Sequence, residues 1–235
     1  MSRERVAPLP SFDPRELPVV EAHDGLPALP AERLSAAALR DRFSNPPVWH
    51  PEQSDDRMRL DRGGDPREAA VLVPIIDHAY GTTLLLTQRT WHLRHHSGQV
   101  AFPGGRLEPT DVSPVDAALR EAHEEIGLEP SRVEIIGPLP EYLTATGFLV
   151  TPIVGLLPSG LALRPDPSEV ADIFEVPLAF LMNPRHHQRR SIRSTSGVEH
   201  SFFTMPYRVP GEAEDRFIWG ATAAMLRNLY RLLAA

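Results

Sequence analysis

The chain has 235 residues, 42% of them hydrophobic and 23% charged, which is the composition of a globular protein with one domain, or one domain plus an extension. It contains neither cysteine nor lysine, which excludes disulfides, zinc–thiolate and iron–sulfur sites, a cysteine nucleophile, and Schiff-base or P-loop lysines. The 24 arginines and 31 acidic residues give a formal net charge of −7, which argues against a nucleic-acid partner.

The first 67 residues stand apart because they hold ten of the 25 prolines. Proline disfavours both helices and central strands, so this region is expected to be largely irregular. One amphipathic pattern predicts a helix at about Ala31 to Phe43. We interpret residues 1–67 as an extension wrapped on a main domain at 68–235, in preference to a separate binding module.

From residue 68 the pattern changes to short apolar runs that predict strands. The first two runs, Ala69–Ile76 and Thr83–Arg89, would be joined by a hairpin at Asp77–Gly81, and a short extended piece would follow at Val100–Pro103. Further strands are expected at Arg132–Ile136, Leu149–Leu156, Val170–Val176, Phe202–Val209 and Phe217–Trp219, and a final amphipathic helix at Ala221–Leu233. Strands flanked by helices indicate a mixed α/β or α+β sandwich.

The clearest helix of the chain is predicted at Pro114–Ile126. Ser113 is a good N-cap residue, Asp116 completes a capping-box pattern, and Gly127 is a natural residue to end the helix. No run has the length of a membrane span, since the most apolar one, Phe148 to Leu157, has ten residues against the ~20 required. We therefore expect a soluble, cytoplasmic protein without a membrane partner.

The predicted helix at 114–126 carries three carboxylates on one face, those of Glu121, Glu124 and Glu125. Carboxylates in such a stripe repel one another unless a positive group lies among them. Magnesium, which prefers oxygen ligands and bridges carboxylates to substrate phosphates, meets that need. The alternative at this point is a solvated acidic helix face.

The segment before this helix is basic. No acidic residue occurs between Asp77 and Glu108, whereas Arg89, Arg94 and Arg106 all lie there. It ends near the pair Gly104–Gly105, and glycine lets the backbone approach a ligand closely. A basic segment beside an acidic helix predicts a phosphate ester or anhydride that arginines bind and a metal activates.

These residues resemble two patterns of one family. Gly105 through Leu128 resembles the Nudix box, with the stretch from Arg120 to Leu128 on its R-E-U-x-E-E-x-G-U half, where U is apolar. Asp111 stands at the position of the first glutamate and lies one residue further from Arg120 than in that pattern. The lead-in from Leu85 to Gly105, L-L-T-Q-R through V-A-F-P-G-G, is similar to the signature of the coenzyme A pyrophosphatase branch, whose box is also one residue longer.

The resemblance implies a Nudix α/β/α sandwich, with its box at about 105–128. It further implies metal-dependent hydrolysis of coenzyme A or its thioesters to adenosine 3′,5′-bisphosphate and 4′-phosphopantetheine, or an acyl derivative of the latter. Mg²⁺ or Mn²⁺ would be held by Glu121, Glu124, Glu125 and the Gly105 carbonyl. By the same resemblance Arg120 would orient the carboxylates, Glu121 or Glu169 would act as general base, and the substrate would be contacted by Arg89, Arg94 and Gln99.

Two alternatives stay open beside this interpretation. One is a Nudix hydrolase with another substrate, such as ADP-ribose, NADH or a nucleoside triphosphate. The other is a catalytically silent Nudix-like binding module that uses the proline-rich extension as a partner surface. The sequence also leaves open the choice between free coenzyme A and its thioesters, and the oligomeric state, for which a homodimer is one option.

Arg94 provides a test of this interpretation. A charge-assisted contact to a phosphate contributes about 1.5–3 kcal/mol, so Arg94→Ala is expected to lower kcat/KM for coenzyme A by roughly tenfold to a hundredfold. If Arg94 binds the 3′-phosphate, dephospho-coenzyme A should be much less affected; if it binds the diphosphate, both substrates should lose equally. Unchanged kinetics on both substrates would remove Arg94 from the site.

Overall fold

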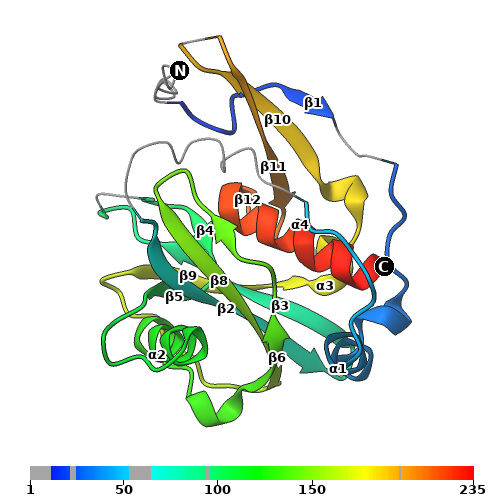
Figure 1. Ribbon diagram of the computed structural model, residues 1–235, viewed down its shortest axis with the longest axis vertical. Helices are drawn as coiled ribbons and strands as arrows, with labels where there is room; N and C mark the ends of the chain where they lie inside the picture. Colours follow the sequence, from blue (N-terminus) through cyan, green and yellow to red (C-terminus); the bar gives the residue numbers. More distant parts are fainter. Residues whose placement is uncertain (1–11, 22–24, 53–64, 94–95, 196) are drawn as a thin grey trace.

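The computed structural model of the protein describes residues 12–21, 25–52, 65–93, 96–195 and 197–235. They form two sheets and four α-helices (Figure 1). Arg94 lies outside the described residues. No helix within the described ranges is long and apolar enough to cross a membrane.

The main sheet has the strand order β4-β3-β2-β8-β6. Its long strands are β2 (Arg67–His78), β3 (Gly81–Arg89) and β8 (Phe148–Pro158), and β2 runs parallel to β8 and antiparallel to β3. The shorter members are β4 (Val100–Ala101), β5 (Gly104–Arg106), β6 (Glu134–Pro138), β7 (Tyr142–Leu143) and β9 (Val170–Pro177). Of these, β5 pairs with β2, β7 with β8 and β9 with β3.

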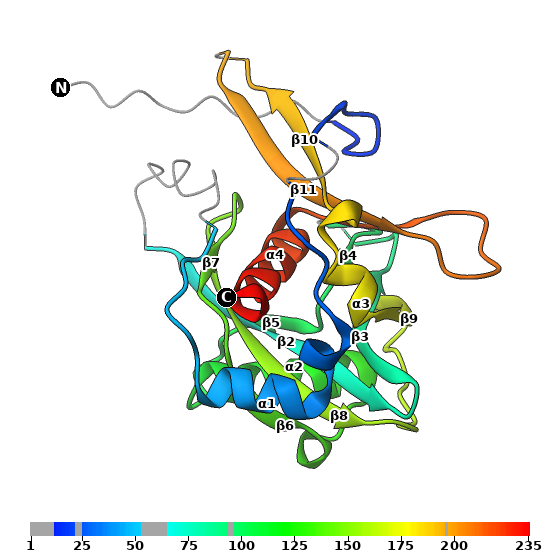
Figure 2. The ribbon, with the colours of Figure 1, turned by 90° about the vertical axis from the view of Figure 1, so that its right-hand side faces the viewer.

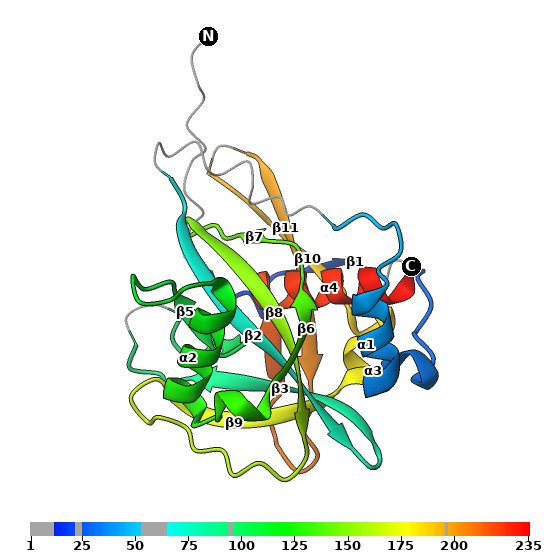
Figure 3. The ribbon, with the colours of Figure 1, turned by 60° about the horizontal axis from the view of Figure 1, so that its bottom comes forward.

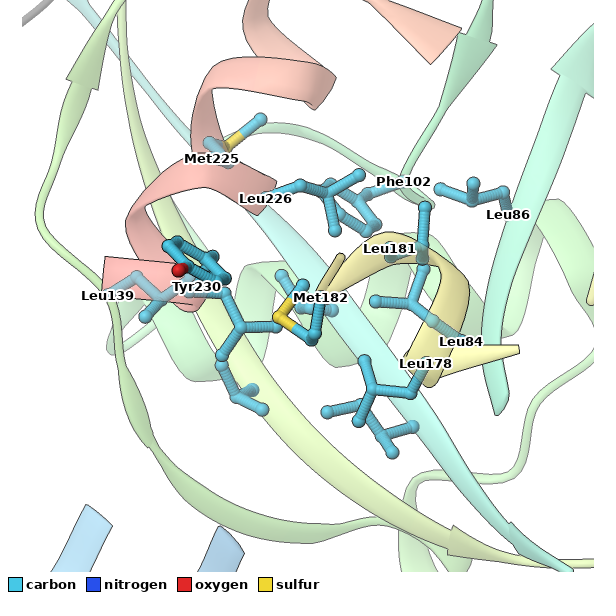
Figure 4. Packing of buried hydrophobic residues seen from close by; sticks show 14 of the residues in the cluster. Leu84, Leu86, Phe102, Leu139, Leu178, Leu181, Met182, Met225, Leu226 and Tyr230 are labelled. Atoms are coloured by element: carbon cyan, nitrogen blue, oxygen red, sulfur yellow. The ribbon is translucent and has the colours of Figure 1, made fainter. Parts of the chain in front are cut away.

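Alternation of side chains along the strands gives the main sheet two apolar faces. In β2, Ala70 and Leu72 belong to one buried cluster, whereas Val73 and Ile75 belong to the other. The first face is covered by α2 (Pro114–Ile126), whose buried alanines let the helix pack closely, as seen from below in Figure 3. The second face packs against α4 (Gly220–Ala234), and Figure 4 shows this core. The predicted α/β (α+β) sandwich with a mixed sheet is therefore confirmed.

A second sheet lies beyond α4, in the order β1-β10-β11-β12. Its strands are β1 (Val19–Glu21), β10 (Gln188–Arg193), β11 (Glu199–Tyr207) and β12 (Arg216–Trp219), all antiparallel. Figure 2 shows the β10–β11 hairpin on the far side of α4 from the main sheet. The sequence did not predict β10, because Q-R-R-S-I-R has little apolar character and is held by its backbone ladder with β11.

The prediction of one continuous helix at 31–43 is wrong. Residues Ala31–Leu34 form a 3₁₀ turn, and α1 begins at Ala36 and ends at Ser44. Ser35 between them has an extended backbone (φ −67°, ψ 152°), and its Oγ accepts a hydrogen bond from the Ala38 N–H, so it acts as N-cap. Leu34 and Leu39 are buried in the core shared with α4.

Other local predictions are refined by small amounts. The first hairpin is tighter than expected, because β2 extends to His78 and β3 begins at Gly81. The limits of α2 are confirmed: Ser113 Oγ accepts from the Asp116 N–H at 3.3 Å, and Gly127 ends the helix at φ 65°. The remaining short elements are α3 (Leu178–Leu181) and the 3₁₀ turns Pro130–Arg132 and Pro184–His186.

Candidate active site

The candidate site lies where the acidic face of α2 meets β5 and the end of β3. Close approach of α2 and β5 is possible because of the residue at 105: a Cβ at Gly105 would lie 2.3 Å from Glu121 Oε1. The neighbouring Gly104 donates its backbone N–H to Glu125 Oε2 at 3.1 Å. The glycine pair thus places backbone directly against two of the predicted carboxylates, whereas the sequence predicted a close approach to a ligand.

Arg120 is the centre of a hydrogen-bond network on this face. Its Nη1 donates to Glu121 Oε1 at 3.0 Å and to Glu124 Oε2 at 3.1 Å. Its Nε and Nη2 donate to both carboxylate oxygens of Asp111, at 3.1 and 3.0 Å, and Nη2 also reaches the Arg106 carbonyl. Arg120 therefore orients Glu121 and Glu124, and Asp111 in turn orients Arg120.

The sequence did not predict that Asp111 takes part in the site. Its side chain is only 4% exposed, and Arg120, with help from the Glu108 N–H, holds the pKa of its carboxyl below the usual value. The hydrogen bond to Asp111 is also the main cause that raises the pKa of Arg120. The sequence signal that could have shown this role is that Asp111 is acidic and stands at the first-glutamate position of the Nudix box, one residue further from Arg120 than in the family pattern.

Glu125 is the most buried of the helix carboxylates, with 4% of its side chain exposed. Burial is the main cause that raises the pKa of its carboxyl to about 7, whereas Arg89 and the Gly104 N–H lower it in part. Arg89 approaches only loosely, with Nη1 at 3.4 Å from Glu125 Oε1. Burial likewise raises the pKa of Glu121, against the effect of Arg120.

Glu169 lies close enough to join this group. It directly precedes β9, and its carboxylate is 3.6 Å from Arg89 Nη2, so that Arg89 lies between Glu125 and Glu169. Its backbone carbonyl accepts from the Thr90 N–H at 2.9 Å. The negative charge of Glu169 contributes to the raised pKa values of Glu121 and Glu125. The structure thus brings a residue from a distant part of the sequence to the site.

The remaining predicted residues are less tightly integrated. Glu124 is on the same network but 56% of its side chain is exposed. Gln99 receives the Arg89 N–H on its backbone carbonyl, and its Oε1 lies 2.9 Å from His96 Nδ1. Arg89, predicted to contact phosphate, faces the carboxylates of Glu125 and Glu169 in this structure.

The residues present fit a divalent cation. The donors are carboxylate oxygens and a glycine carbonyl, which are the ligands that Mg²⁺ prefers. Glu125 is buried and Glu121 is partly buried, and burial raises the pKa of both carboxyls despite the nearby arginines, so their negative charge is compensated only in part. In the part of the chain that the structure describes, no three acidic or histidine side chains already converge on one point. The negative charge of these carboxylates is instead neutralised in part by Arg120 and Arg89.

A cavity of about 590 Å³ opens beside this group. Arg89, Gly104, Gly105 and Arg106 line one part of it, and apolar side chains from α4 and the second sheet line much of the rest. The cavity lies at the face of the main sheet opposite α2, and Arg89, which contacts Glu125, also lines it. Sequence reasoning did not predict this cavity, because its walls come from segments far apart in the chain.

The raised pKa of Glu125 makes stability depend on pH. Between about pH 4.5 and 7 the folded protein holds a proton that the unfolded chain releases, so the free energy of unfolding of the metal-free protein should fall as pH rises through this range. The full difference amounts to about 3 kcal/mol. Glu125→Gln keeps the size of the side chain and removes the charge, so it should be more stable than the wild type at pH 8 by about this amount.

Urea unfolding in EDTA at pH 5 and pH 8 measures this effect. Glu129→Gln, which alters an exposed carboxylate near the end of the same helix, is the matched control and should show no such gain. A Glu125→Gln variant less stable than the wild type at pH 8 would contradict the burial argument.

Comparison with known proteins is consistent with this geometry. The model of the NUDIX domain family matches residues 66–193. The curated protein called uncharacterized Nudix hydrolase NudL, from Escherichia coli strain K12, is 46% identical over 164 residues, which cover 69% of this chain and 81% of the relative. Its namesake from Shigella boydii serotype 18 has the same identity and coverage.

Among solved structures, a MutT/nudix family protein from Enterococcus faecalis aligns with 85% of this chain and 75% of its own, at 17% identity and a TM-score of 0.47. The family model spans more than half of the chain and includes every helix carboxylate described above. Together with the NudL relatives, it shows that this chain belongs to the Nudix family.

Proposed function

We propose that the protein hydrolyses the diphosphate bond of coenzyme A or its thioesters, with Mg²⁺ or Mn²⁺ as cofactor. As a Nudix hydrolase, the chain acts on nucleoside diphosphate derivatives, and members of the family generally use such metals. The NudL relatives' names specify no substrate. The choice of coenzyme A is supported by the stretch from Leu85 to Gly105, which resembles the signature of the coenzyme A pyrophosphatase branch.

The observation that carries the proposed chemistry is the burial of Glu125 and the partial burial of Glu121 against the backbone of β5, without full compensation by cations. Glu121, Glu124, Glu125 and the Gly105 carbonyl would hold the metal. When bound, the metal neutralises charge on the diphosphate and activates water for attack. A chain that only bound nucleotides would gain nothing from carboxylates that repel one another and an anionic ligand.

The chain's own residues have separate parts in this reaction. Arg120, fixed by Asp111, keeps the Glu121 carboxylate in one orientation. Glu121 and Glu169 are the two candidates for the base that takes the proton of the attacking water. The water oxygen bonds to one phosphorus, the anhydride bond breaks, and the other phosphate leaves.

The proposed substrate contacts come from the basic side of the site. Arg89 and Arg106 line the cavity beside Gly104 and Gly105, and Gln99 lies on the same wall. Arg89 would contact phosphate from a position where it already compensates Glu125 and Glu169. Arg94, which lies outside the described residues, completes the proposed phosphate contacts.

A panel of substrates tests the proposal. Coenzyme A, ADP-ribose, NADH and a nucleoside triphosphate are incubated with Mg²⁺ or Mn²⁺, and products are separated by chromatography. We expect adenosine 3′,5′-bisphosphate and 4′-phosphopantetheine as the main products, with coenzyme A preferred. Glu125→Gln should lower turnover of coenzyme A by at least about 100-fold, because a charge at a metal-activated site is lost. Glu129→Gln again serves as control. Comparable turnover of ADP-ribose and coenzyme A would contradict the assignment of substrate.

Alanine substitutions at the two neighbouring glycines should have different effects. A Cβ at Gly105 meets the far end of the Glu121 side chain rather than backbone, so Gly105→Ala should displace this carboxylate and lower kcat/KM at least about tenfold while the melting temperature changes little. A Cβ at Gly104, where φ is +154°, would lie 2.4 Å from the Ala70 carbonyl oxygen, which is backbone of the main sheet. Gly104→Ala should therefore lower the melting temperature. Wild-type kinetics for Gly105→Ala would show that the position of Glu121 does not matter.

A further inference from the structure

One arginine from outside the family match is packed against the edge of the candidate site. Arg216 lies in β12, beyond the matched range of 66–193, and 17% of its side chain is exposed. Its guanidinium lies over the ring of Phe174 in β9, 4.8 Å from the ring centroid. A residue of the second sheet therefore contacts a strand of the main sheet.

The guanidinium of Arg216 contacts three polar partners at once. Its Nη2 donates to Asp172 Oδ2 in β9 at 2.7 Å, and its Nη1 reaches Gln88 Oε1 in β3 at 3.5 Å. Its Nε and Nη2 also donate to the two carboxylate oxygens of Glu212, at 2.8 and 2.6 Å. The planar fork of an arginine, with five N–H donors, is suited to such a three-way contact.

Gln88 and Asp172 form the last regular pair of the β3–β9 ladder. The register shifts directly after them, because Arg89 pairs with Val170 and Ala171 has no opposite residue in β3. A bulge of this kind interrupts the ladder and turns the side chains beside it. Regular strand pairing alone therefore does not set the orientation of Arg89.

The side chain of Gln88 links Arg216 to the backbone beyond the bulge. It is nearly buried, and while its Oε1 faces Arg216, its Nε2 donates to the Gly98 carbonyl. The next carbonyl, that of Gln99, accepts the Arg89 N–H at 2.9 Å. Gln88 thus joins the two backbone segments on either side of Arg89, and Arg216 holds Gln88 from the side of the second sheet.

The bulge aims Arg89 at two carboxylates of the candidate site. The Arg89 guanidinium lies 3.4 Å from Glu125 Oε1 and 3.6 Å from Glu169 Oε2. Glu169 is itself tied to the bulge, because its backbone carbonyl accepts the Thr90 N–H at 2.9 Å. A shift of the bulge would therefore move Arg89 relative to both carboxylates.

We propose that Arg216 is a positioning residue of the site: by holding Gln88 and Asp172 together, it fixes the bulge that aims Arg89 at the substrate diphosphate. This rests on the proposed function, in which Arg89 contacts phosphate. The second sheet then acts on the reaction through Arg89. An arginine that only fastened β12 to the main sheet would contribute to stability, and its effect on the reaction would not depend on Arg89.

A double-mutant cycle tests this dependence. The substrate is the compound of the panel that the wild type hydrolyses fastest, so the test does not depend on the choice of coenzyme A. Arg216→Gln should lower kcat/KM at least about tenfold. In the Arg89→Ala protein the same change should lower it less than about threefold, because the group that Arg216 positions is gone. If Arg89→Ala turns over too slowly, affinity in EDTA, measured by calorimetry, replaces kcat/KM in the cycle.

The matched control lies in the same connection between β11 and β12. Arg208→Gln removes an exposed ion pair, that of Arg208 with Asp215, and should leave kcat/KM unchanged. Gln88→Leu keeps a side chain of similar size and removes both contacts of the amide, so it should lower kcat/KM at least about threefold. Circular dichroism checks folding, and Gln88→Leu decides the matter if Arg216→Gln does not fold.

Hydrogen exchange measures the position of the bulge without turnover. The Arg89 and Thr90 amides, whose hydrogen bonds span the bulge, should exchange at least about tenfold faster in Arg216→Gln than in the wild type. The amides of α2 should exchange at the same rate in both proteins, because Arg216 makes no contact with that helix in the hydrogen bonds given above.

The outcomes separate the two proposals. An equal loss of kcat/KM with and without Arg89 overturns the positioning role, because Arg216 would then act on the reaction by another route. Unchanged kinetics in Arg216→Gln, or unchanged exchange of the Arg89 and Thr90 amides, also overturns it. If no compound of the panel is hydrolysed, the proposed function fails, and the exchange rates alone then decide whether Arg216 holds the bulge.

Discussion

The site depends on one electrostatic constraint: α2 holds one buried carboxylate, Glu125, and one partly buried carboxylate, Glu121, beside the backbone of β5 with only partial compensation by arginine. Glu125 has a pKa near 7 for this reason, and Glu121 is oriented by Arg120. Such an arrangement persists only if the elements around it are firmly held. The N-cap at Ser113, the left-handed Gly127 and the buried alanines of α2 fix the helix on the main sheet, and Gly105 leaves the space that Glu121 occupies.

The rest of the fold encloses the cavity that lies beside this arrangement. One face of the main sheet supports α2, and the other supports α4 and, beyond it, the second sheet. The N-terminal region contributes to the same side: Tyr230 on α4 donates to the Pro27 carbonyl at 2.7 Å, and Arg231 contacts the Glu52 carboxylate at 2.6 Å. Parts outside the family match thus build an apolar space next to the reacting groups, while the matched part carries the charges.

Local features were predictable from the sequence, and non-local ones were not. The caps of α2 and the apolar runs of β2 and β3 depend on neighbouring residues, so capping patterns and local composition located them. The strand β10 was missed because an arginine-rich strand is held by its pairing with β11. The anchoring of Arg120 by Asp111 and the aromatic wall that Phe12 forms in the cavity with Phe202 and Trp219 depend on contacts that spacing alone does not reveal. The break at Ser35, in contrast, is a local N-cap that the amphipathic pattern overlooked.

The central claim is that Glu125 is a buried carboxylate whose charge the folded chain leaves for a metal ion to compensate. The most direct test is the pKa of Glu125, measured by carbon-13 NMR of the carboxyl group, with Glu125→Gln used to assign the signal, first in EDTA and then with saturating Mg²⁺. We expect a pKa near 7 without metal and a clearly lower pKa with it, because a nearby cation favours the ionised form. An ordinary pKa in the metal-free protein, or one that Mg²⁺ does not change, would contradict it.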